Sequence, residues 1–303
     1  MAAHALDGLT VNELKARLRS RGCTDFSQFL ERGDLLQALG AGPPSSGARA
    51  PLAGCSGAGP SVGSTWAGSG GGPGEEDAEH EVEVGPGCSL RVAERRSAFD
   101  NGNTGAVLWD SSVRLARHVF GLGRSRVAGK RVVELGCGTG LAGLAAGMQG
   151  AHVTLTDLPE VLSQTTQANL EANHAALRAP PAGTLAGEVE LQPLRWGDGV
   201  DHLQPGPPFD FVLAADIIYR PELFEPLRKT LLQLSGPGTH VLLAYTRRRS
   251  QEEWFFSSVC EDFSCSVISG GDGSSSEAGW RGFCRFGESA IFLLVRKPHG
   301  SSL

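Results

Sequence analysis

The sequence lacks any apolar run that approaches the roughly 20 residues of a membrane-spanning helix. Its amino terminus also lacks an uninterrupted hydrophobic segment after the first charges, so we expect no secretory signal. Charge of one sign does not dominate, because 27 Lys and Arg oppose 33 Asp and Glu, for a net charge of −6. We therefore expect no membrane partner, and bulk charge gives no reason to expect a nucleic-acid partner.

Cysteine pairs at short spacing are also missing. The seven cysteines are scattered, none forms a C-x-x-C pair, and none stands beside His at the spacing of zinc ligands. We therefore expect no metal site. This usage suits a reducing compartment and predicts a cytoplasmic or nuclear protein.

Residues 1–40 carry the pattern of a small helical module. Thr10 and Glu13 form a capping box at the start of a helix that Gly22 ends. The string L-T-V-x-x-L-K-x-x-L-x-x-x-G, followed by D-L-L-x-x-L, resembles the SAP-type helix–turn–helix module. SAP modules often bind nucleic acid, but basic and acidic residues nearly cancel here, and phosphate affinity depends on clustered cations. We favour protein docking, with weak nucleic-acid binding as the alternative.

Residues 41–86 are expected to form a flexible linker. Up to residue 74 the chain is almost wholly Gly, Pro, Ser and Ala, and an acidic run follows from Glu75 to Glu83. Such a segment cannot bury enough apolar surface to offset the entropy lost on ordering. Residues 87–299 then have the composition of one catalytic-sized domain.

In this domain short apolar runs alternate with segments of helical spacing. Strands are expected near residues 89–93, 131–135, 152–156, 189–191, 209–214, 239–245, 263–268 and 290–296. Helices are expected near residues 111–120, 141–148, 158–176, 221–234 and 251–259. This alternation predicts an α/β fold with a doubly wound, mainly parallel sheet, and the final two strands suggest an antiparallel pair at one edge.

The stretch Arg131–Asp157 has the pattern of a nucleotide-binding βαβ unit. Gly136, Gly138 and Gly140 follow a buried strand and let backbone N–H groups approach a ligand. Asp157 ends the next strand, about twenty residues on, where such a site needs a carboxylate for the ribose hydroxyls. The sequence predicts a site for an adenosine-type cofactor.

Two cofactor classes fit the glycines. The string G-T-G-L-A-G satisfies G-x-G-x-x-G, which by itself is weak support for a dinucleotide. Counted from Gly136, however, the third required glycine is Leu141, and Glu134 stands at the end of the strand. A carboxylate there would repel a pyrophosphate but suits a cofactor with a sulfonium and an α-amino group, such as S-adenosylmethionine.

Five short strings, in order, carry a family resemblance: V-L-W-D at 107–110, E-L-G-C-G-T-G at 134–140, T-L-T-D-L at 154–158, L-R-W-G at 194–197 and A-A-D-I-I-Y at 214–219. Together they resemble the family-16 branch of the seven-β-strand methyltransferases, which is rich in protein-lysine methyltransferases. The resemblance implies the sheet order 3-2-1-4-5-7-6, S-adenosylmethionine as cofactor, and methylation of a protein side chain.

Transferred residue by residue, the resemblance implies a cofactor site with three parts. The glycine turn lies under the methionine moiety and the ribose, Asp157 holds the ribose hydroxyls, and two tryptophans pack on the cofactor. The cofactor-binding residues expected in this way are Trp109, Glu134, Gly136, Cys137, Gly138, Gly140, Asp157, Leu158, Trp196 and Ala215.

Asp216 and Tyr219 are the candidate catalytic residues. Methyl transfer is an in-line displacement, so the protein mainly aligns and desolvates the acceptor. We expect Asp216 to bind and orient an amine, and Tyr219 to wall the channel around its alkyl stem. A capping role for Asp216 in a strand-to-helix turn is the structural alternative. Residues 247–249, three consecutive arginines, would either meet an acidic substrate patch or form a solvated turn.

These features predict a monomeric S-adenosylmethionine-dependent methyltransferase that modifies a lysine of a protein substrate. The sequence carries no N/D-P-P-[YF] signature, which disfavours nucleobase and glutamine acceptors. The alternative is a non-catalytic scaffold that binds the cofactor and joins a SAP-type contact to partners.

Overall fold

The computed structural model describes residues 77–100, 102–178, 186–248, 252–270 and 289–298, together with Arg17 and Ser20. The chain divides into two compact units, residues 1–76 with 100–102 and residues 77–99 with 103–303, and only the second is described here. Apart from those two residues, the SAP-like module lies outside the described residues, as does the linker up to residue 76. Among the described residues no helix is long and apolar enough to cross a membrane.

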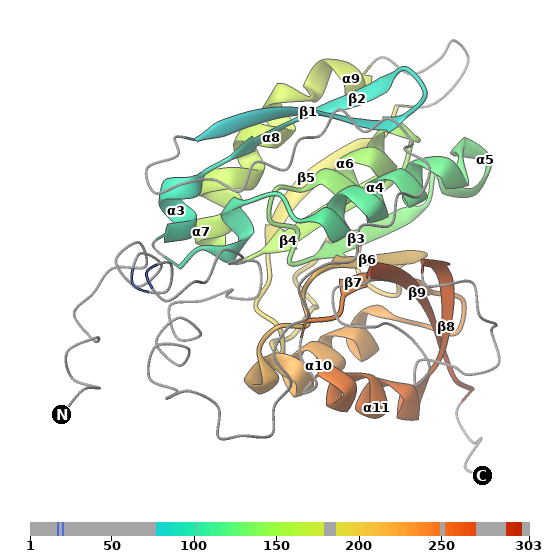
Figure 1. Cartoon of the computed structure of the whole chain (residues 1–303). Helices are drawn as coiled ribbons and strands as arrows, with labels where there is room; N and C mark the ends of the chain where they lie inside the picture. Colours follow the sequence, from blue (N-terminus) through green and yellow to red (C-terminus); the bar gives the residue numbers. More distant parts are fainter. Residues whose placement is uncertain are drawn as a thin grey trace, which may run out of the picture. The chain divides into compact units, whose positions relative to one another are not determined.

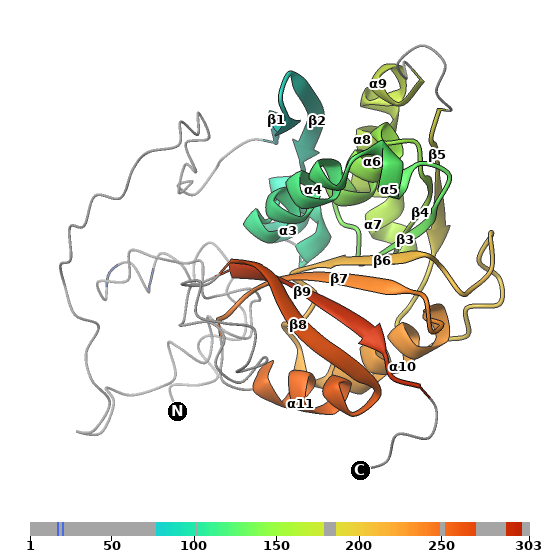
Figure 2. The ribbon, with the colours of Figure 1, turned by 90° about the vertical axis from the view of Figure 1, so that its right-hand side faces the viewer.

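The core of the second unit is a seven-stranded sheet (Figures 1 and 2). Its strands are β3 (Arg131–Leu135), β4 (His152–Asp157), β5 (Glu188–Pro193), β6 (Phe211–Ala215), β7 (His240–Thr246), β8 (Phe263–Gly270) and β9 (Ser289–Arg296). They lie in the order β5-β4-β3-β6-β7-β9-β8. The first five strands in this order, from β5 through β4, β3 and β6 to β7, are parallel, and β9 pairs antiparallel with both β7 and β8. This is the predicted order 3-2-1-4-5-7-6, including the antiparallel edge.

Helices cover both faces of the sheet, as a doubly wound fold requires. On one face lie α4 (Asp110–Leu122), α5 (Arg124–Val127), α6 (Leu141–Met148), α8 (Gln167–Ala172) and α9 (His174–Arg178). On the other lie α10 (Phe224–Leu234), preceded by η3 (Pro221–Leu223), and α11 (Glu252–Asp262). Each face has its own apolar core, one built around Leu115 and Leu144 and the other around Phe255 and Phe292.

The helix expected over residues 158–176 is interrupted. It consists of α7 (Pro159–Val161), the π-helical turn η2 (Leu162–Thr166), α8 and α9. The wider π turn coincides with a functional contact, since the Thr166 hydroxyl donates to the Gly138 carbonyl at 2.7 Å.

The domain begins earlier than the sequence suggested. β1 (Ala78–Gly85) and β2 (Cys88–Glu94) form an antiparallel hairpin, so the predicted linker boundary at residue 86 is wrong. The acidic run alternates with apolar residues, and Val82 and Val84 face inward at period two while the intervening glutamates face solvent. The hairpin packs across α4 and α8, outside the sheet.

Two buried asparagines attach this hairpin to the domain. The Asn169 side chain accepts from the Ala93 N–H at 2.7 Å and donates to the Thr139 carbonyl at 3.0 Å. The Asn173 side chain accepts from the Arg91 N–H at 2.9 Å and donates to the Arg91 carbonyl at 2.7 Å. The two side-chain amides bond backbone groups on the edge of β2 that does not pair with β1. The Asn169 amide also connects β2 to the glycine turn through the Thr139 carbonyl.

Candidate active site

The glycine turn between β3 and α6 forms the floor of the candidate site. Gly136 and Gly138 have φ of 59° and 50°, in the left-handed region that favours glycine. A Cβ on Gly138 would lie 3.0 Å from the Gly105 carbonyl oxygen, so two backbones meet there without side chains between them. Gly140 has φ of 79° and directly precedes α6. The turn thereby brings backbone that carries no Cβ at Gly136, Gly138 and Gly140 to the carboxyl edge of the sheet, where open α/β sheets bind ligands.

Asp157 joins this turn to the next strand. Its carboxylate accepts from the Gly138 N–H at 2.9 Å and from the Leu158 N–H at 2.8 Å. Burial raises the pKa of this carboxyl to about 6, against the lowering effect of these two hydrogen bonds. Each carboxylate oxygen has a further lone pair, which fits the acceptor that ribose hydroxyls need. The geometry of Asp157 and of the half-buried Leu158 is compatible with the expected cofactor site.

Glu134 has a different place from the one expected. Its side chain is buried beneath the turn, and it accepts from the Gly143 N–H in the first turn of α6 at 2.7 Å. Burial raises the pKa of this carboxyl to about 8. Glu134 therefore fastens helix α6 to β3 from inside. The expected effect of its charge on a cofactor stays a prediction, and what the structure shows is this hydrogen bond to α6.

Cys137 likewise turns its side chain inward. The thiol is buried beside the Thr166 hydroxyl, and burial raises its pKa well above the usual range. Its backbone N–H donates to the Thr156 carbonyl at 3.0 Å. Cys137 thus shapes the turn through its backbone.

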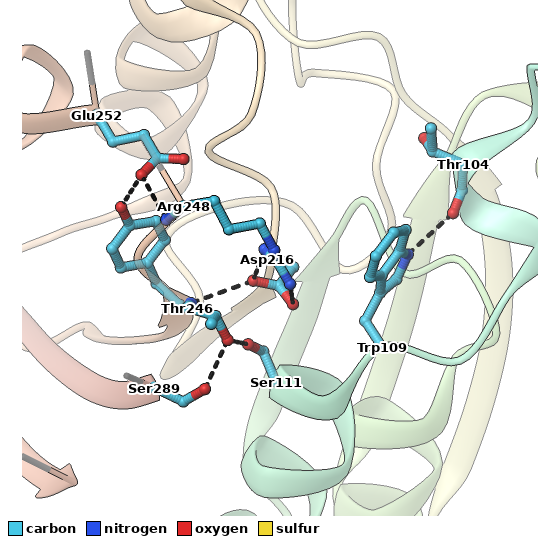
Figure 3. Close-up of polar contacts among 9 residues, drawn as sticks. Thr104, Trp109, Ser111, Asp216, Thr246, Arg248, Glu252 and Ser289 are labelled. Carbon is cyan, nitrogen blue, oxygen red and sulfur yellow. Dashed lines mark hydrogen bonds and ion pairs between the residues drawn. The ribbon is translucent and has the colours of Figure 1, made fainter. Parts of the chain in front are cut away.

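The two tryptophans belong to different parts of the chain, Trp196 to the segment after β5 and Trp109 to the segment before α4. A Cβ on Gly136 would lie 2.9 Å from the Trp196 ring and 2.9 Å from Ile217, so Trp196 packs directly on the turn. Trp109 precedes α4, and its indole N–H donates to the Thr104 carbonyl at 3.0 Å (Figure 3). Both rings are half-buried, as expected of side chains that leave one face to a ligand.

Asp216 follows β6 beside Ala215 and has an unusual backbone. With φ of 54° it has the one positive φ among the described non-glycine residues. Its carboxylate accepts from the Thr246 N–H at 3.2 Å and from both terminal nitrogens of Arg248, at 2.9 and 3.0 Å (Figure 3). The Asp216 side chain is only 3% exposed. A strained backbone held by such a network is typical of a functional position.

Arg248 is itself held from three directions. Its guanidinium lies over the Trp109 ring, 5.4 Å from the ring centroid, and pairs with Asp216. Its backbone N–H donates to the buried Glu252 carboxylate at 3.1 Å, and Glu252 also accepts from the Tyr245 hydroxyl. Burial lowers the pKa of Arg248, but Asp216, Glu252 and Tyr245 together outweigh burial and the net pKa is raised, so the residue stays charged.

The arginine triplet therefore splits. Arg248 turns inward, Arg247 pairs with Glu253 at the surface, and residue 249 lies outside the described residues. Neither expected role, an acidic-patch contact or a solvated turn, applies to Arg248. Tyr245, near the end of β7, is buried at 3% exposure.

A row of hydroxyls borders Asp216 on the side of α4. The Ser111 and Thr246 hydroxyls are 2.8 Å apart, and those of Thr246 and Ser289 are 2.6 Å apart (Figure 3). They connect α4, β7 and β9 next to the Thr246 N–H that binds Asp216. No sequence motif indicated this cluster, because its members lie far apart along the chain.

Two further residues complete the surroundings. Asp110, the first residue of α4, is exposed, and its pKa is raised by partial burial and by Asp216, while Arg248 and Arg114 lower it. Tyr219 is half-buried in the segment after β6. The expected residues thus gather at the carboxyl ends of β3, β4 and β6, the edge where open α/β sheets bind ligands.

Glu94 is a supporting residue that sequence reasoning missed. It is 3% exposed and accepts from the Leu108 N–H at 2.8 Å and from Arg96 at 2.9 Å, and its carboxylate lies 3.2 Å from the His80 Nε2. It thereby fixes the segment that leads into Trp109. The described residues contain no group of three or more side chains suited to hold a metal ion.

Comparison with protein families matches residues 83–262 to the family described as lysine methyltransferase. Protein N-lysine methyltransferase METTL21A of Danio rerio is 39% identical over 163 residues, which cover 54% of this chain and 70% of that protein. EEF1A lysine methyltransferase 3 of Xenopus tropicalis is 35% identical over 170 residues, which cover 56% of this chain and 69% of that protein.

Among solved structures, a TehB-like SAM-dependent methyltransferase from Corynebacterium glutamicum aligns with a TM-score of 0.42 and 15% identity. The alignment covers 67% of this chain and 95% of that one. The family match runs from the end of β1 to the end of α11, so it includes the glycine turn, Asp157, both tryptophans, Asp216 and Arg248.

Proposed function

The chain belongs to the lysine methyltransferase family, and on that premise we propose how its residues divide the transfer of a methyl group to a protein lysine. It is an S-adenosylmethionine-dependent enzyme that methylates lysine in proteins. The cofactor supplies an electrophilic methyl group carried by a sulfonium. The roles of single residues and the identity of the acceptor are our proposals.

The cofactor end comprises the glycine turn, Asp157 and the tryptophans. Asp157 accepts the ribose hydroxyls, the backbone at Gly136 and Gly138 lies against the rest of the cofactor, and Trp196 covers it. Leu158 and Ala215 line the same edge, while Glu134, Cys137 and Gly140 hold the turn in shape. The observation that carries this assignment is the convergence of these groups at one edge of the sheet.

The acceptor end comprises Asp216 and Tyr219, and Trp109 lies where it meets the cofactor end. Asp216 orients the incoming amine, and the aromatic side chains enclose its alkyl stem. A narrow, partly desolvated site also lowers the pKa of the amine and so favours its neutral, nucleophilic form. Methyl transfer requires the amine to be aligned with the methyl group, and Asp216 is proposed to align it. Loss of Asp216 should therefore lower turnover more than cofactor affinity.

We further propose EEF1A as the first acceptor to test, since relatives from Xenopus tropicalis and Mus musculus carry the name EEF1A lysine methyltransferase 3. Residues 1–40 would act as a docking module on a tether that ends before Asp77, which raises the local concentration of any substrate that the module binds. Cysteine usage supports a cytoplasmic or nuclear location, and we propose a monomeric enzyme.

The test is methylation by the purified protein of recombinant EEF1A and, separately, of a cell extract, with isotopically labelled cofactor. We expect a labelled protein whose digest contains methylated lysine, and loss of the label with Asp216→Asn. Asp201→Asn, a change at an exposed carboxylate, is the matched control and should keep the label. No labelled protein from either source, or label that persists with Asp216→Asn, would contradict the proposal.

A further inference from the structure

The carboxylate proposed to orient the acceptor amine already has a cation of its own. Arg248 makes two hydrogen bonds to Asp216, and Thr246 makes a third. We propose that Arg248 is a charge-compensating positioning residue, which neutralises Asp216 so that an acceptor lysine beside it can lose its proton. The inference rests on the proposed function, and it adds a residue to that function's acceptor site.

The need for such a residue follows from the chemistry of lysine. A free lysine has a pKa of about 10.4, and only its neutral amine is a nucleophile. An isolated carboxylate within about 4–6 Å raises that pKa further, because it stabilises the ammonium. A guanidinium has the opposite effect, and it keeps its charge throughout the pH range in which lysine titrates.

The position of Arg248 is fixed enough for this role. Its side chain is only 15% exposed, and it is confined between the Asp216 carboxylate and the Trp109 ring. Its backbone is fixed by Glu252, which is buried and also bound by Tyr245. A displaceable arginine would need neither anchor. The pair is therefore anchored on both the side-chain and the backbone side of Arg248 within the proposed acceptor site.

The charged side chains around the Asp216–Arg248 pair include more carboxylates than cations, so they would attract one further cation. α4 contributes Asp110 and Arg114, β6 is followed by Asp216, and α11 contributes Glu252, near Tyr245 of β7. Asp110 is the exposed carboxylate of this group, and it senses the charges of both Asp216 and Arg248. With Asp216 compensated, Asp110 attracts the ammonium from solvent, and Asp216 offers hydrogen-bond acceptors without a full uncompensated charge.

The proposed step is deprotonation of the acceptor lysine followed by transfer of the methyl group to its amine. The ammonium gives one proton to water, and the neutral amine then forms its new N–C bond as the methyl–sulfur bond breaks. The bonding electron pair stays with sulfur. Arg248 takes no proton and forms no bond in this sequence, so its effect lies in the proton equilibrium of the acceptor.

The test is the pH dependence of kcat with EEF1A as acceptor, or with the extract protein that the wild type labels, measured from pH 6.5 to 10.5. The variant Arg248→Gln leaves Asp216 uncompensated. In the wild type, kcat should rise with pH as the acceptor amine loses its proton, and this rise is the activity limb of the pH profile. In Arg248→Gln the limb should move to higher pH by about 1–3 units. At neutral pH kcat should then fall about tenfold for each pH unit of that shift, and it should recover at high pH. KM should not rise, because the ammonium is bound at least as well.

Two controls separate this effect from a structural one. Arg248→Lys keeps the charge and should keep most of the wild-type pH limb. Arg247→Gln makes the same charge change on the neighbouring residue, whose partner is the surface residue Glu253, and should leave the limb in place. Calorimetric binding of S-adenosylhomocysteine to each variant reports whether the fold and cofactor site are intact.

A drop in kcat by the same factor at every pH, or an Arg248→Gln variant more active than wild type at neutral pH, would overturn the inference. The first result would mean a purely structural role, and the second would mean that Arg248 blocks the acceptor site. If the wild type labels no lysine, the proposed function itself fails. If it does and the limb is unmoved, only this inference fails.

Discussion

The guanidinium of Arg248 meets the carboxylate of Asp216 through two hydrogen bonds of 2.9 and 3.0 Å. The residues are 32 positions apart and follow the adjacent parallel strands β6 and β7. The pair therefore exists because the sheet places the ends of these strands side by side. The pair joins the candidate acceptor site to the Glu252 end of α11. The charge around Asp216 therefore depends on which strands the sheet places next to each other.

Gly138→Ala should abolish cofactor binding and destabilise the protein. The new Cβ would lie 3.0 Å from the Gly105 carbonyl oxygen, at a backbone φ of 50° that disfavours alanine. We expect a loss of about 1–3 kcal/mol in the free energy of unfolding, measured by urea denaturation. Gly121→Ala in α4 is the matched control, because a Cβ there meets nothing within 4 Å. Equal stability of the two variants would contradict this account of the turn.

Asp157→Asn should weaken binding of S-adenosylhomocysteine by about 10–100-fold. The change removes a charged acceptor and leaves one of the two N–H groups, of Gly138 or Leu158, poorly satisfied. Isothermal titration calorimetry provides the measurement, with Asp201→Asn as an exposed control. Since the Asp157 pKa is about 6, wild-type affinity should also fall as pH drops below 6. Unchanged affinity in the variant would mean that Asp157 does not hold the cofactor.

Glu134 should make the unliganded protein less stable as pH rises. Its pKa is about 8 when folded against 4.5 for the free group, so between these values the folded state holds a proton that the unfolded state lacks. Stability is therefore greatest near the lower value and falls towards pH 8. From pH 5.5 to 8 we expect a loss of about 3 kcal/mol from this residue, measured by urea unfolding.

The variant Glu134→Gln keeps the acceptor for the Gly143 N–H and removes the titration. It should lose most of that pH dependence, with only the smaller contribution of Asp157 remaining, whose raised pKa acts in the same direction. Glu81→Gln, at an exposed position of β1, should behave as wild type. A wild-type stability that does not change between pH 5.5 and 8 would contradict the burial of an ionisable group here.

Asn169→Ala should loosen the hairpin from the domain. The side chain is 0% exposed, and its loss leaves the Ala93 N–H and the Thr139 carbonyl without their partner. We expect a cost of about 2–4 kcal/mol and faster hydrogen exchange in β1 and β2. Gln167→Ala, on the exposed side of the same helix, is the control. Unchanged exchange in β2 would show that the hairpin is held by other contacts.

Much of the fold could be predicted, for identifiable reasons. The buried strand before Gly136 and the acid at Asp157 predicted the βαβ unit, and the family strings supplied the strand order. Strand β2 was expected, but β1 was missed because its glutamates dominate its composition, although Val82 and Val84 alternate with them. Strand alternation here was a better guide than charge.

The site was only partly predictable. The residues of the glycine turn, such as Gly138, are close to one another in the sequence, so the sequence predicts that they lie together in the site. The direction of the Glu134 side chain depends on the pleat of β3, and the Arg248 pairing depends on which strands adjoin. Neither can be read from local spacing. Consequently the sequence singled out Asp216 as a candidate residue but did not predict its pairing with Arg248.

The most direct test of the central claim is tandem mass spectrometry of EEF1A, and of extract proteins, after incubation with purified wild-type enzyme or Asp216→Asn and S-adenosylmethionine. We predict methyl groups on lysine ε-amines with the wild type and their loss with Asp216→Asn, while both proteins still bind S-adenosylhomocysteine. Methylation confined to arginine or histidine, or lysine methylation equal in both proteins, would contradict the account.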